Sequence, residues 1–298
     1  LRVYKKHKVY SNSCIIILNV PWAYHSVLKY NGKRDRKYFY MVYDFPVKKS
    51  GSKIKNRIKI KSTQNFHKYK LDLRKKNNLI KKLEVINPDL IINLAGFKNP
   101  RKNELNKKKS YEENFIINKH LTDYCKKNKK KLIYTSTDLV YGDIVKKPTE
   151  KQGLNPNTLH GINKLKSEAY IKKNMKNYLI LRFATVYDEI DDGDENFINA
   201  SCKKIINKKE VYAATNIYRN FISTQQLTSV LEKLIHFRVY GTYNVGEEAS
   251  SYFDKIKSIC LKRKINYKRY LFKTKINVNP EYRAPNLKKF KSLINKIK

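Results

Sequence analysis

The sequence predicts an α/β protein built on a doubly wound parallel sheet, with a small C-terminal substrate lobe. Short apolar runs, such as CIIIL at 14–18 and LIINL at 90–94, alternate with stretches of helical periodicity. In addition, Asp, Gly or hydroxyl residues follow the ends of several of these runs. This alternation indicates βαβ units, whose right-handed crossovers give a parallel sheet with helices on both faces.

The elements follow one another along the chain, separated by glycine, proline and polar residues. Strands are predicted at 14–18, 38–43, 69–73, 90–94, 132–134, 178–183 and 241–245. Helices are predicted at 22–30, 77–86, 111–128, 157–173, 196–207, 224–237 and 252–261, the last with a cap at Ser250 or Ser251. The segments 46–63 and 98–109 are expected to be loops, and the basic tail from 262 is expected to be irregular.

The 298 residues suffice for one large domain, or for a domain with a lobe. No apolar run reaches the length of about eighteen residues that a membrane span needs, and the polar first residues do not suit a signal peptide. Because the chain begins with Leu1, a fragment or a processed product is left open. The four cysteines are scattered singly, which argues against zinc or a disulfide framework and fits a cytoplasmic location.

The net charge of +41 invites a nucleic-acid or anionic-membrane partner. The basic residues are nearly all lysines, and they spread along the chain together with abundant Ile, Asn and Tyr. A selected binding patch would instead cluster on one element. A chain-wide drift in composition is therefore preferred, and neither a membrane nor a nucleic acid is expected as a partner.

Polar residues and glycine at the ends of predicted strands mark a candidate crevice, because ligands in such folds bind beyond the carboxyl ends of the strands. These residues are Asp44, Asp72, Ala95, Gly96, Ser136, Thr137 and Thr185. On the next helix, His160 and Lys164 lie four residues apart and share one face. The hydroxyl groups and this polar pair form a plausible small-molecule active site.

Several motifs stand in one order between about residues 71 and 289. They are KLDLRKKNNLIKKL, NPDLIINLAG, YEENFIIN, YTSTDLVYGD, LHGINKLKSE, YLILRFATVYD, IYRNFISTQQLTSVL, GTYNVGEEAS and YRAPNLKKF. In this order they resemble the extended short-chain dehydrogenase/reductases. Within that family the chain is most similar to the sugar-nucleotide epimerases, dehydratases and dTDP-4-dehydrorhamnose reductases. The resemblance implies a Rossmann-like fold, NAD as the cofactor and a nucleotide sugar as the substrate.

The resemblance also implies roles for residues at matching positions. In catalysis, Thr137 would hydrogen-bond the sugar, Lys164 would bind the nicotinamide ribose, and Asp138 resembles an acidic neighbour in the rhamnose-reductase branch. NAD would be contacted by Asp44, Asp72, Ala95, Gly96, Asn114 and Lys164, with Asp72 at the adenine. The substrate would be contacted by Ser136, Thr185, Arg219 and Arg283, with the two arginines at its pyrophosphate.

Two segments depart from the family pattern. His160 occupies the position of the acid/base tyrosine, where an imidazole can shuttle protons but would be driven toward its neutral form by Lys164. The turn after the first strand, Asn19–His25, lacks the glycines that let backbone amides approach a pyrophosphate. Asp44 nevertheless suits a ribose 2′-hydroxyl and favours NAD over NADP.

Each candidate also has a structural interpretation. Thr137 and Ser136 could satisfy backbone groups at a strand end, and Asn114 could bridge a helix to a neighbouring strand. Lys164 could form only a surface ion pair with Glu168. The acidic segment 188–195 could bind a cation, although a solvated loop is preferred. The histidines show no metal-ligand spacing, so no metal site is predicted.

The combined prediction is an NAD-dependent nucleotide-sugar epimerase or dehydratase. The alternative is a catalytically impaired protein of the same fold that acts as a binding or regulatory subunit. The dinucleotide-binding domain is expected at 1–186 and the substrate lobe at 187–298, with 216–246 returning to the Rossmann-like core. A homodimer is left open.

Overall fold

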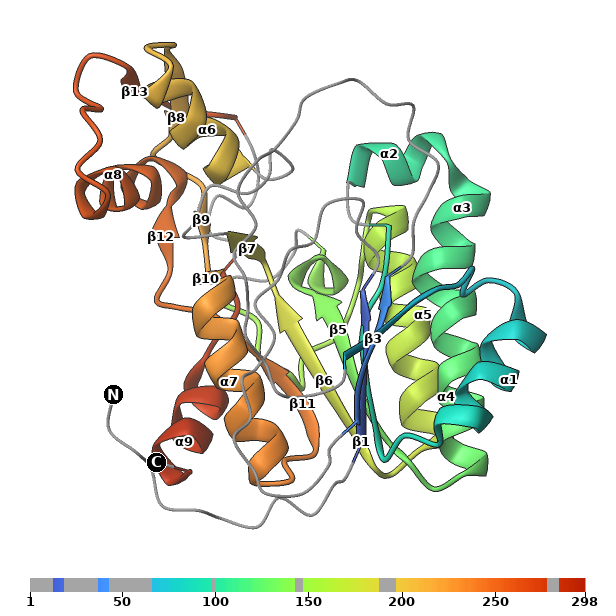
Figure 1. Cartoon of the computed structure of the whole chain (residues 1–298). Coiled ribbons are helices and arrows are strands. Elements are labelled where there is room, and N and C mark those ends of the chain that lie inside the picture. Colours follow the sequence, from blue (N-terminus) through green and yellow to red (C-terminus); the bar gives the residue numbers. More distant parts are fainter. Residues whose placement is uncertain are drawn as a thin grey trace.

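A computed structural model describes residues 13–18, 37–42, 66–97, 100–142, 147–187, 197–277 and 284–297, of which 13–18, 37–42 and 66–70 are described by their backbone alone. Its largest unit is a seven-stranded sheet with helices on both faces (Figure 1). The strands are β1 (Ser13–Leu18), β2 (Lys37–Val42), β3 (Phe66–Lys70), β4 (Leu90–Leu94), β5 (Lys131–Thr137), β6 (Tyr178–Phe183) and β11 (Gly241–Asn244).

The strand order is β3-β2-β1-β4-β5-β6-β11, and every neighbouring pair is parallel. The chain therefore starts in the middle of the sheet, builds outward to β3, and then returns to build the other half. This is the order of doubly wound dinucleotide-binding folds. The predicted parallel α/β architecture is confirmed.

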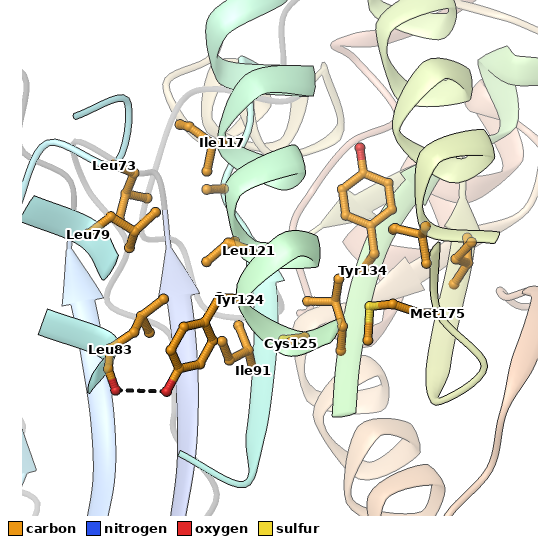
Figure 2. Close-up of a cluster of buried hydrophobic side chains, with 14 residues drawn as sticks. Leu73, Leu79, Leu83, Ile91, Ile117, Leu121, Tyr124, Cys125, Tyr134 and Met175 are labelled. Carbon is orange, nitrogen blue, oxygen red and sulfur yellow. Dashed lines mark hydrogen bonds between the residues drawn. The ribbon is translucent and has the colours of Figure 1, made fainter. Parts of the chain in front are cut away.

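Helices on one face bury an apolar cluster against the sheet. They include α1 (Lys76–Ile86), α4 (Ile117–Lys127) and α5 (Leu159–Asn174). In Figure 2, Leu79 and Leu83 of α1 lie next to Leu121 and Tyr124 of α4 above Ile91 of β4. The Tyr124 hydroxyl donates to the Leu83 carbonyl oxygen at 2.9 Å, which satisfies a polar group inside this core.

The opposite face of the sheet is covered by α7 (Thr224–His236) and α9 (Lys288–Lys296) (Figure 1). Leu234 of α7 and Phe290 of α9 belong to a second cluster, together with Leu90 and Ile92 of β4. Because β4 is covered on both faces, all its residues except Asn93 are apolar, and they do not alternate with polar ones.

A third buried cluster lies in the C-terminal part of the chain. It is formed around α6 (Phe197–Ile206), α8 (Tyr252–Lys262) and the parallel pair β8 (Val211–Ala214) and β13 (Leu271–Thr274). Short strand pairs lie nearby, namely β7 (Thr185–Tyr187) with β10 (Phe221–Ser223), and β9 (Tyr218–Arg219) with β12 (Ser250–Ser251). The domain boundary at residue 186 stays a prediction.

The polar segment predicted as a loop at 98–109 is helical over most of its described length, so that prediction is wrong. It contains α2 (Pro100–Leu105), and α3 (Lys107–Tyr111) begins within it. The Asn103 side chain donates to the Phe97 carbonyl oxygen at 2.8 Å and accepts from Ser110 Oγ at 2.5 Å. These buried bonds replace the apolar contacts that sequence periodicity can detect.

A π-helical turn, η1 (Glu112–Ile116), joins α3 to α4 and changes which side chains face inward. Tyr111, at the end of α3, is 40% exposed. Asn114 and Asn118 are buried together with Ile117 and Leu121. The helix predicted at 111–128 is therefore present, but a π-helical turn interrupts its regular period.

Smaller differences affect the strand ends and the tail. Strand β3 ends at Lys70, so Asp72 lies beyond the strand rather than within it, and β5 extends to Thr137, so its hydroxyls lie in the strand. The tail after 262 is not irregular, since it contains β13 and α9. The predicted helix at 22–30 and loop at 46–63 lie outside the described residues.

Candidate active site

The turn after β4 is held by asparagine side chains. Asn93 Oδ1 accepts from the Ala95 backbone N–H at 3.0 Å. Asn114 of η1 accepts from the Phe97 N–H at 3.0 Å and donates to the Phe97 carbonyl oxygen at 3.2 Å. The structural role considered for Asn114, a bridge from a helix to the β4 segment, is therefore present.

Gly96 lies where the end of β4 approaches η1 and α5. A Cβ atom at this position would lie 2.8 Å from Asn114 Oδ1 and 3.2 Å from Lys164 Nζ. A side chain there would collide with two of the predicted cofactor-binding residues. The absence of a side chain at Gly96 therefore keeps Asn114 and Lys164 in place beside the backbone.

Lys164 is buried, with 6% of its surface exposed, on the face of α5 that packs against β5. Its Nζ donates to the Thr135 carbonyl oxygen at 2.9 Å and lies 4.8 Å from the centre of the Tyr134 ring. A surface ion pair with Glu168 is wrong as an interpretation of Lys164, because both side chains are buried.

His160 lies one helical turn before Lys164 and is 7% exposed. Its Nδ1 is 3.0 Å from the Phe97 carbonyl oxygen. Burial, together with the charge of Lys164, lowers the pKa of His160 from 6.5 to about 3. The imidazole is therefore neutral near pH 7, in the direction that the sequence predicts for a histidine beside Lys164.

A second group of polar residues lies just past β5, at the start of the 3₁₀ turn η2 (Asp138–Tyr141). Thr137 Oγ1 donates to Asp138 Oδ1 at 3.2 Å and accepts from the Leu139 backbone N–H at 3.2 Å. Arg219 of β9 donates to Asp138 Oδ2 at 2.6 Å. Thr137 thus caps a backbone group, as its structural interpretation proposed, and also contacts a carboxylate that pairs with Arg219.

Ser136 points to a buried ion pair. Its hydroxyl donates to Glu168 Oε1 of α5 at 2.6 Å, and Arg182 of β6 donates to the two carboxylate oxygens of Glu168 at 2.8 and 2.5 Å. Neither Glu168 nor Arg182 is exposed to solvent. This pair was not among the sequence predictions, although an arginine inside the apolar run YLILRF indicates a buried charge that needs a partner.

The same network continues to the last strand of the sheet. Arg182 Nη1 donates to the Tyr141 hydroxyl oxygen at 2.7 Å, and that hydroxyl donates to Asn244 Oδ1 of β11 at 2.7 Å. The Asn244 amide donates to the Pro148 carbonyl oxygen at 3.2 Å. Side chains from α5, β6, η2 and β11 are thereby joined beneath the candidate site.

The structure brings some of the predicted residues together and separates others. Gly96, Asn114, His160 and Lys164 surround the turn after β4, with Ala95 in the same turn, whereas Thr137, Asp138 and Arg219 meet after β5. Asp72 accepts from Arg74 at 3.0 and 2.9 Å, and Thr185 begins β7 and pairs with Phe221.

Several candidates fall outside the residues that the structure describes. They are Asp44, Arg283, the turn Asn19–His25 and the acidic segment 188–195. Within the described ranges, no three His, Cys, Asp or Glu side chains gather as a metal site. None of the helices in that part of the chain combines the length and the hydrophobicity that a membrane span would require.

Solved structures with this fold provide one comparison. dTDP-4-dehydrorhamnose reductase from Bacillus anthracis, in complex with NADP, is 20% identical over 77% of this chain and 84% of its own, with a TM-score of 0.69. UDP-glucose 4-epimerase from Thermotoga maritima, with UDP-glucose, is 17% identical over 93% and 91%, with a TM-score of 0.70. The enzyme WbmH from Bordetella bronchiseptica, with NAD+, is 13% identical over 96% and 92%, with a TM-score of 0.72.

Sequence comparison assigns the family. No curated protein matches the chain. Residues 50–280, well over half of the chain, match the family described as the RmlD substrate binding domain. This chain therefore belongs to the RmlD substrate binding domain family, and its resemblance to the extended short-chain dehydrogenase/reductases is confirmed.

Proposed function

We propose that this protein is an NAD-dependent oxidoreductase that acts on a sugar carbon of a nucleotide sugar, in the manner of an epimerase or dehydratase. The observation that carries the proposal is the position of Lys164. Its ammonium group is buried between the ends of β4 and β5, beside Gly96 and one helical turn from His160. A buried cation at the carboxyl end of a parallel sheet is placed where this class of fold receives its ligand.

The described residues fit the nicotinamide end of a dinucleotide. Asn114 and Lys164 pack against the backbone of Gly96, where a Cβ atom would displace both of these predicted cofactor ligands. Lys164 would bind the nicotinamide ribose, while Ala95 and Gly96 would allow a close approach of the ligand. When bound, the dinucleotide supplies hydride transfer to or from the sugar. Asp44 and the turn Asn19–His25 would lie at the other end of the dinucleotide, and they fall outside the described residues.

The second group of residues would hold the nucleotide sugar. Thr137 would hydrogen-bond the reacting sugar, and Arg219 would contact the pyrophosphate together with Arg283. Arginine suits this role, because its planar guanidinium pairs with two phosphate oxygens. The Asp138 contact holds the Arg219 guanidinium near Thr137, so the sugar and its phosphates would be bound close to each other.

Support also comes from the solved structures of the same fold, whose complexes contain NADP, NAD+ or UDP-glucose. Neither these structures nor the family match supports the alternative of a subunit without turnover, and that alternative stays a prediction. The cytoplasmic location and the homodimer stay predictions as well.

Isothermal titration calorimetry with NAD+ and NADP+ tests the proposal. The wild-type protein is expected to bind NAD+ more tightly than NADP+. Gly96→Val should weaken binding about tenfold or more, since its side chain would enter the space beside Asn114 and Lys164. Gly153→Val is the matched control, because a Cβ atom at Gly153 meets nothing within 4 Å. Absence of binding of both dinucleotides at millimolar concentration overturns the proposal.

Turnover is tested separately from binding. Nucleotide sugars are added to the protein with NAD+, and reduced nicotinamide and the sugar products are measured by absorbance and mass spectrometry. A modified sugar that is absent with Lys164→Met supports the oxidoreductase. Binding of both ligands without any product would favour the binding subunit instead.

A further inference from the structure

A cavity of about 690 Å³ lies along the polar face of α9. Its described walls also include Lys147, which precedes α5 in the chain, and Glu248, which follows β11. The opposite face of α9 carries Phe290 and Ile297, which pack into the apolar cluster on the sheet. Pockets for small ligands commonly have volumes of about 300–1,000 Å³, so this cavity is large enough to hold one.

Lysine side chains dominate the charge of this cavity. Lys147, Lys288, Lys291 and Lys296 line it, and Glu248 is the only acid among its described lining residues. Glu248 pairs with Lys291, but their side chains are 80% and 49% exposed, so water screens the pair. Although lysines spread along the whole sequence, these four converge on one cavity from opposite parts of the chain. The wall is therefore positively charged and suits an anion with more than one charge.

The first turn of α9 adds to this positive charge. Leu287 occupies the N-cap position and has no side-chain oxygen to cap the helix, and Asn286 Oδ1 accepts from the Lys288 backbone N–H alone at 2.8 Å. The other N–H groups of the first turn lack helical partners and carry partial positive charge. Leu287 and Lys288 both line the cavity. The helix dipole and the lysines therefore attract the same kind of ligand.

Asn220 contributes a polar group of the opposite character. It lines the cavity and is only 3% exposed. Its carboxamide nitrogen donates to the Glu247 carbonyl oxygen at 2.9 Å, which identifies the other atom as the oxygen. Within the described part of the chain, that oxygen has no hydrogen-bond partner. A buried acceptor without a donor costs free energy, and a hydroxyl group of a ligand would provide the missing donor.

The cavity is separate from the candidate active site. Arg219 and Asn220 are consecutive residues in the extended segment from β9 to β10, so their side chains point to opposite sides. Arg219 contacts Asp138 at 2.6 Å beside Thr137, whereas Asn220 lines the cavity. Neither Lys164 nor Thr137 is among the described residues that line the cavity.

We propose that this cavity is a second ligand site, which binds a small sugar or polyol that carries at least two phosphate groups. The phosphate groups would contact the lysine ammonium groups and the first turn of α9, and a hydroxyl group would donate to Asn220 Oδ1. This inference goes beyond the proposed function and does not depend on it, because it requires neither NAD nor turnover.

Isothermal titration calorimetry of the full chain tests the proposal with fructose 1,6-bisphosphate as the probe. We expect binding that weakens as the salt concentration rises. Inorganic pyrophosphate should bind more weakly, because it has no sugar hydroxyl for Asn220, and the neutral polyol mannitol should not bind. Absence of bisphosphate binding at millimolar concentration overturns the proposal. Equal or tighter binding of pyrophosphate overturns the assignment of a sugar or polyol.

Charge variants with opposite expected effects locate the site. Lys288→Met combined with Lys296→Met should weaken bisphosphate binding about tenfold. Lys76→Met combined with Lys81→Met, on the exposed surface of α1 at the other face of the sheet, removes the same charge and should leave binding unchanged. Glu248→Gln removes the acid of the cavity and should tighten binding about threefold. Equal losses in the two double variants would show attraction by net charge alone and overturn the proposal.

Arg219→Met distinguishes this cavity from the candidate active site. A bisphosphate held in the cavity should bind this variant as it binds the wild-type protein, with circular dichroism confirming that the variant is folded. A loss as large as that of the α9 double variant would assign the bisphosphate to the candidate active site and overturn the second site. Failure of NAD+ to bind would overturn the proposed function and leave this inference intact.

Discussion

The Glu168 carboxylate and the Arg182 guanidinium form a bidentate ion pair, with N–O distances of 2.8 and 2.5 Å. Neither side chain is exposed to solvent. Burial alone would raise the pKa of the Glu168 carboxyl. The hydrogen bonds and charge of Arg182, with help from Lys172 and Ser136, outweigh burial and lower this pKa below 4.5. The pair is therefore ionised, and it fastens α5 to β6 beneath the candidate site.

Removing one partner of this pair should destabilise the fold strongly. Glu168→Leu or Arg182→Leu leaves the other charge buried without its counterion, which costs about 3–5 kcal/mol of unfolding free energy. The double variant should be less destabilised than the sum of the two single variants, because it leaves neither charge behind. Urea denaturation monitored by circular dichroism gives all three values.

An exposed pair provides the matched control for this cycle. Lys119 and Asp123 of α4 lie 3.2 Å apart, and their side chains are 37% and 32% exposed. Lys119→Leu should change the unfolding free energy by only about 0–1 kcal/mol, since water screens this contact. Similar losses at both pairs would contradict a special role for burial at Glu168.

Neutral His160 should make the protein sensitive to mild acid. The folded-state pKa of about 3 lies below the ordinary 6.5, so the unfolded state binds more protons between these values. The contribution of neutral His160 to the free energy of unfolding is fully present above about pH 6.5. It falls by up to about 1.4 kcal/mol per pH unit as the pH drops toward 3. His160→Phe should flatten the curve of stability against pH in this window.

Two other groups define the controls for that measurement. Burial also lowers the pKa of His120, so His120→Phe shows how much another histidine contributes in the same window. Glu168 changes the dependence of stability on pH only below about pH 4.5. In that range its lowered carboxyl pKa makes the free energy of unfolding fall as the pH drops further. Between about pH 4.5 and 6.5 the histidines act together with Glu232, whose carboxyl pKa is raised by burial and whose effect on stability has the opposite sign. An unchanged slope in His160→Phe would show that His160 is already charged or accessible to water.

Gly161 should not tolerate a side chain. A Cβ atom would lie 2.6 Å from the Leu139 carbonyl oxygen and 2.9 Å from Pro156, so Gly161→Ala must move α5 away from η2. We expect a loss of about 1–3 kcal/mol in unfolding free energy, although alanine is the better helix former. Gly153→Ala, in open surroundings, is the control for thermal and urea unfolding. A stabilised Gly161→Ala protein would contradict the close packing of these elements.

The Asp138–Arg219 contact should connect the end of β5 to β9. Asp138→Asn removes the charge that faces Arg219 at 2.6 Å, and we expect a loss of about 1–3 kcal/mol in unfolding free energy. The Thr137 hydroxyl also loses an ionised acceptor. Urea denaturation of Asp138→Asn, Arg219→Met and the double variant measures the coupling. Purely additive effects would show that the contact contributes nothing of its own.

The sheet was predictable because its signals are local. The runs at β4 and β6 have the bounds that the sequence predicts, since strands covered on both faces are mostly apolar, here with the exceptions of Asn93 and Arg182. Ser251 is the N-cap of α8, as one of the two predicted caps, because a serine before an apolar period is a strong start signal. The family resemblance was available for a similar reason, namely the order of short motifs along the chain.

Elements that are stabilised by distant polar contacts were not predictable. Asn103 and Ser110 hold α2 and α3 through bonds to the segment after β4, and no periodicity reveals such bonds. Strand β13 exists because Leu271 pairs with Val211, sixty residues earlier in the chain. The sequence placed His160 next to Lys164, but only the structure shows the Phe97 carbonyl that fixes its tautomer.

The packing of α9 bears on how this chain folds during synthesis. Phe290 and Ile297 complete the cluster on the α7 face of the sheet, against strands that begin near residue 90. During synthesis, most of that apolar surface is therefore made long before α9, the helix that covers it. Until α9 emerges, the face of β4 and β6 next to α7 is available to chaperones or to other nascent chains, whereas the α1 and α4 face can already be closed.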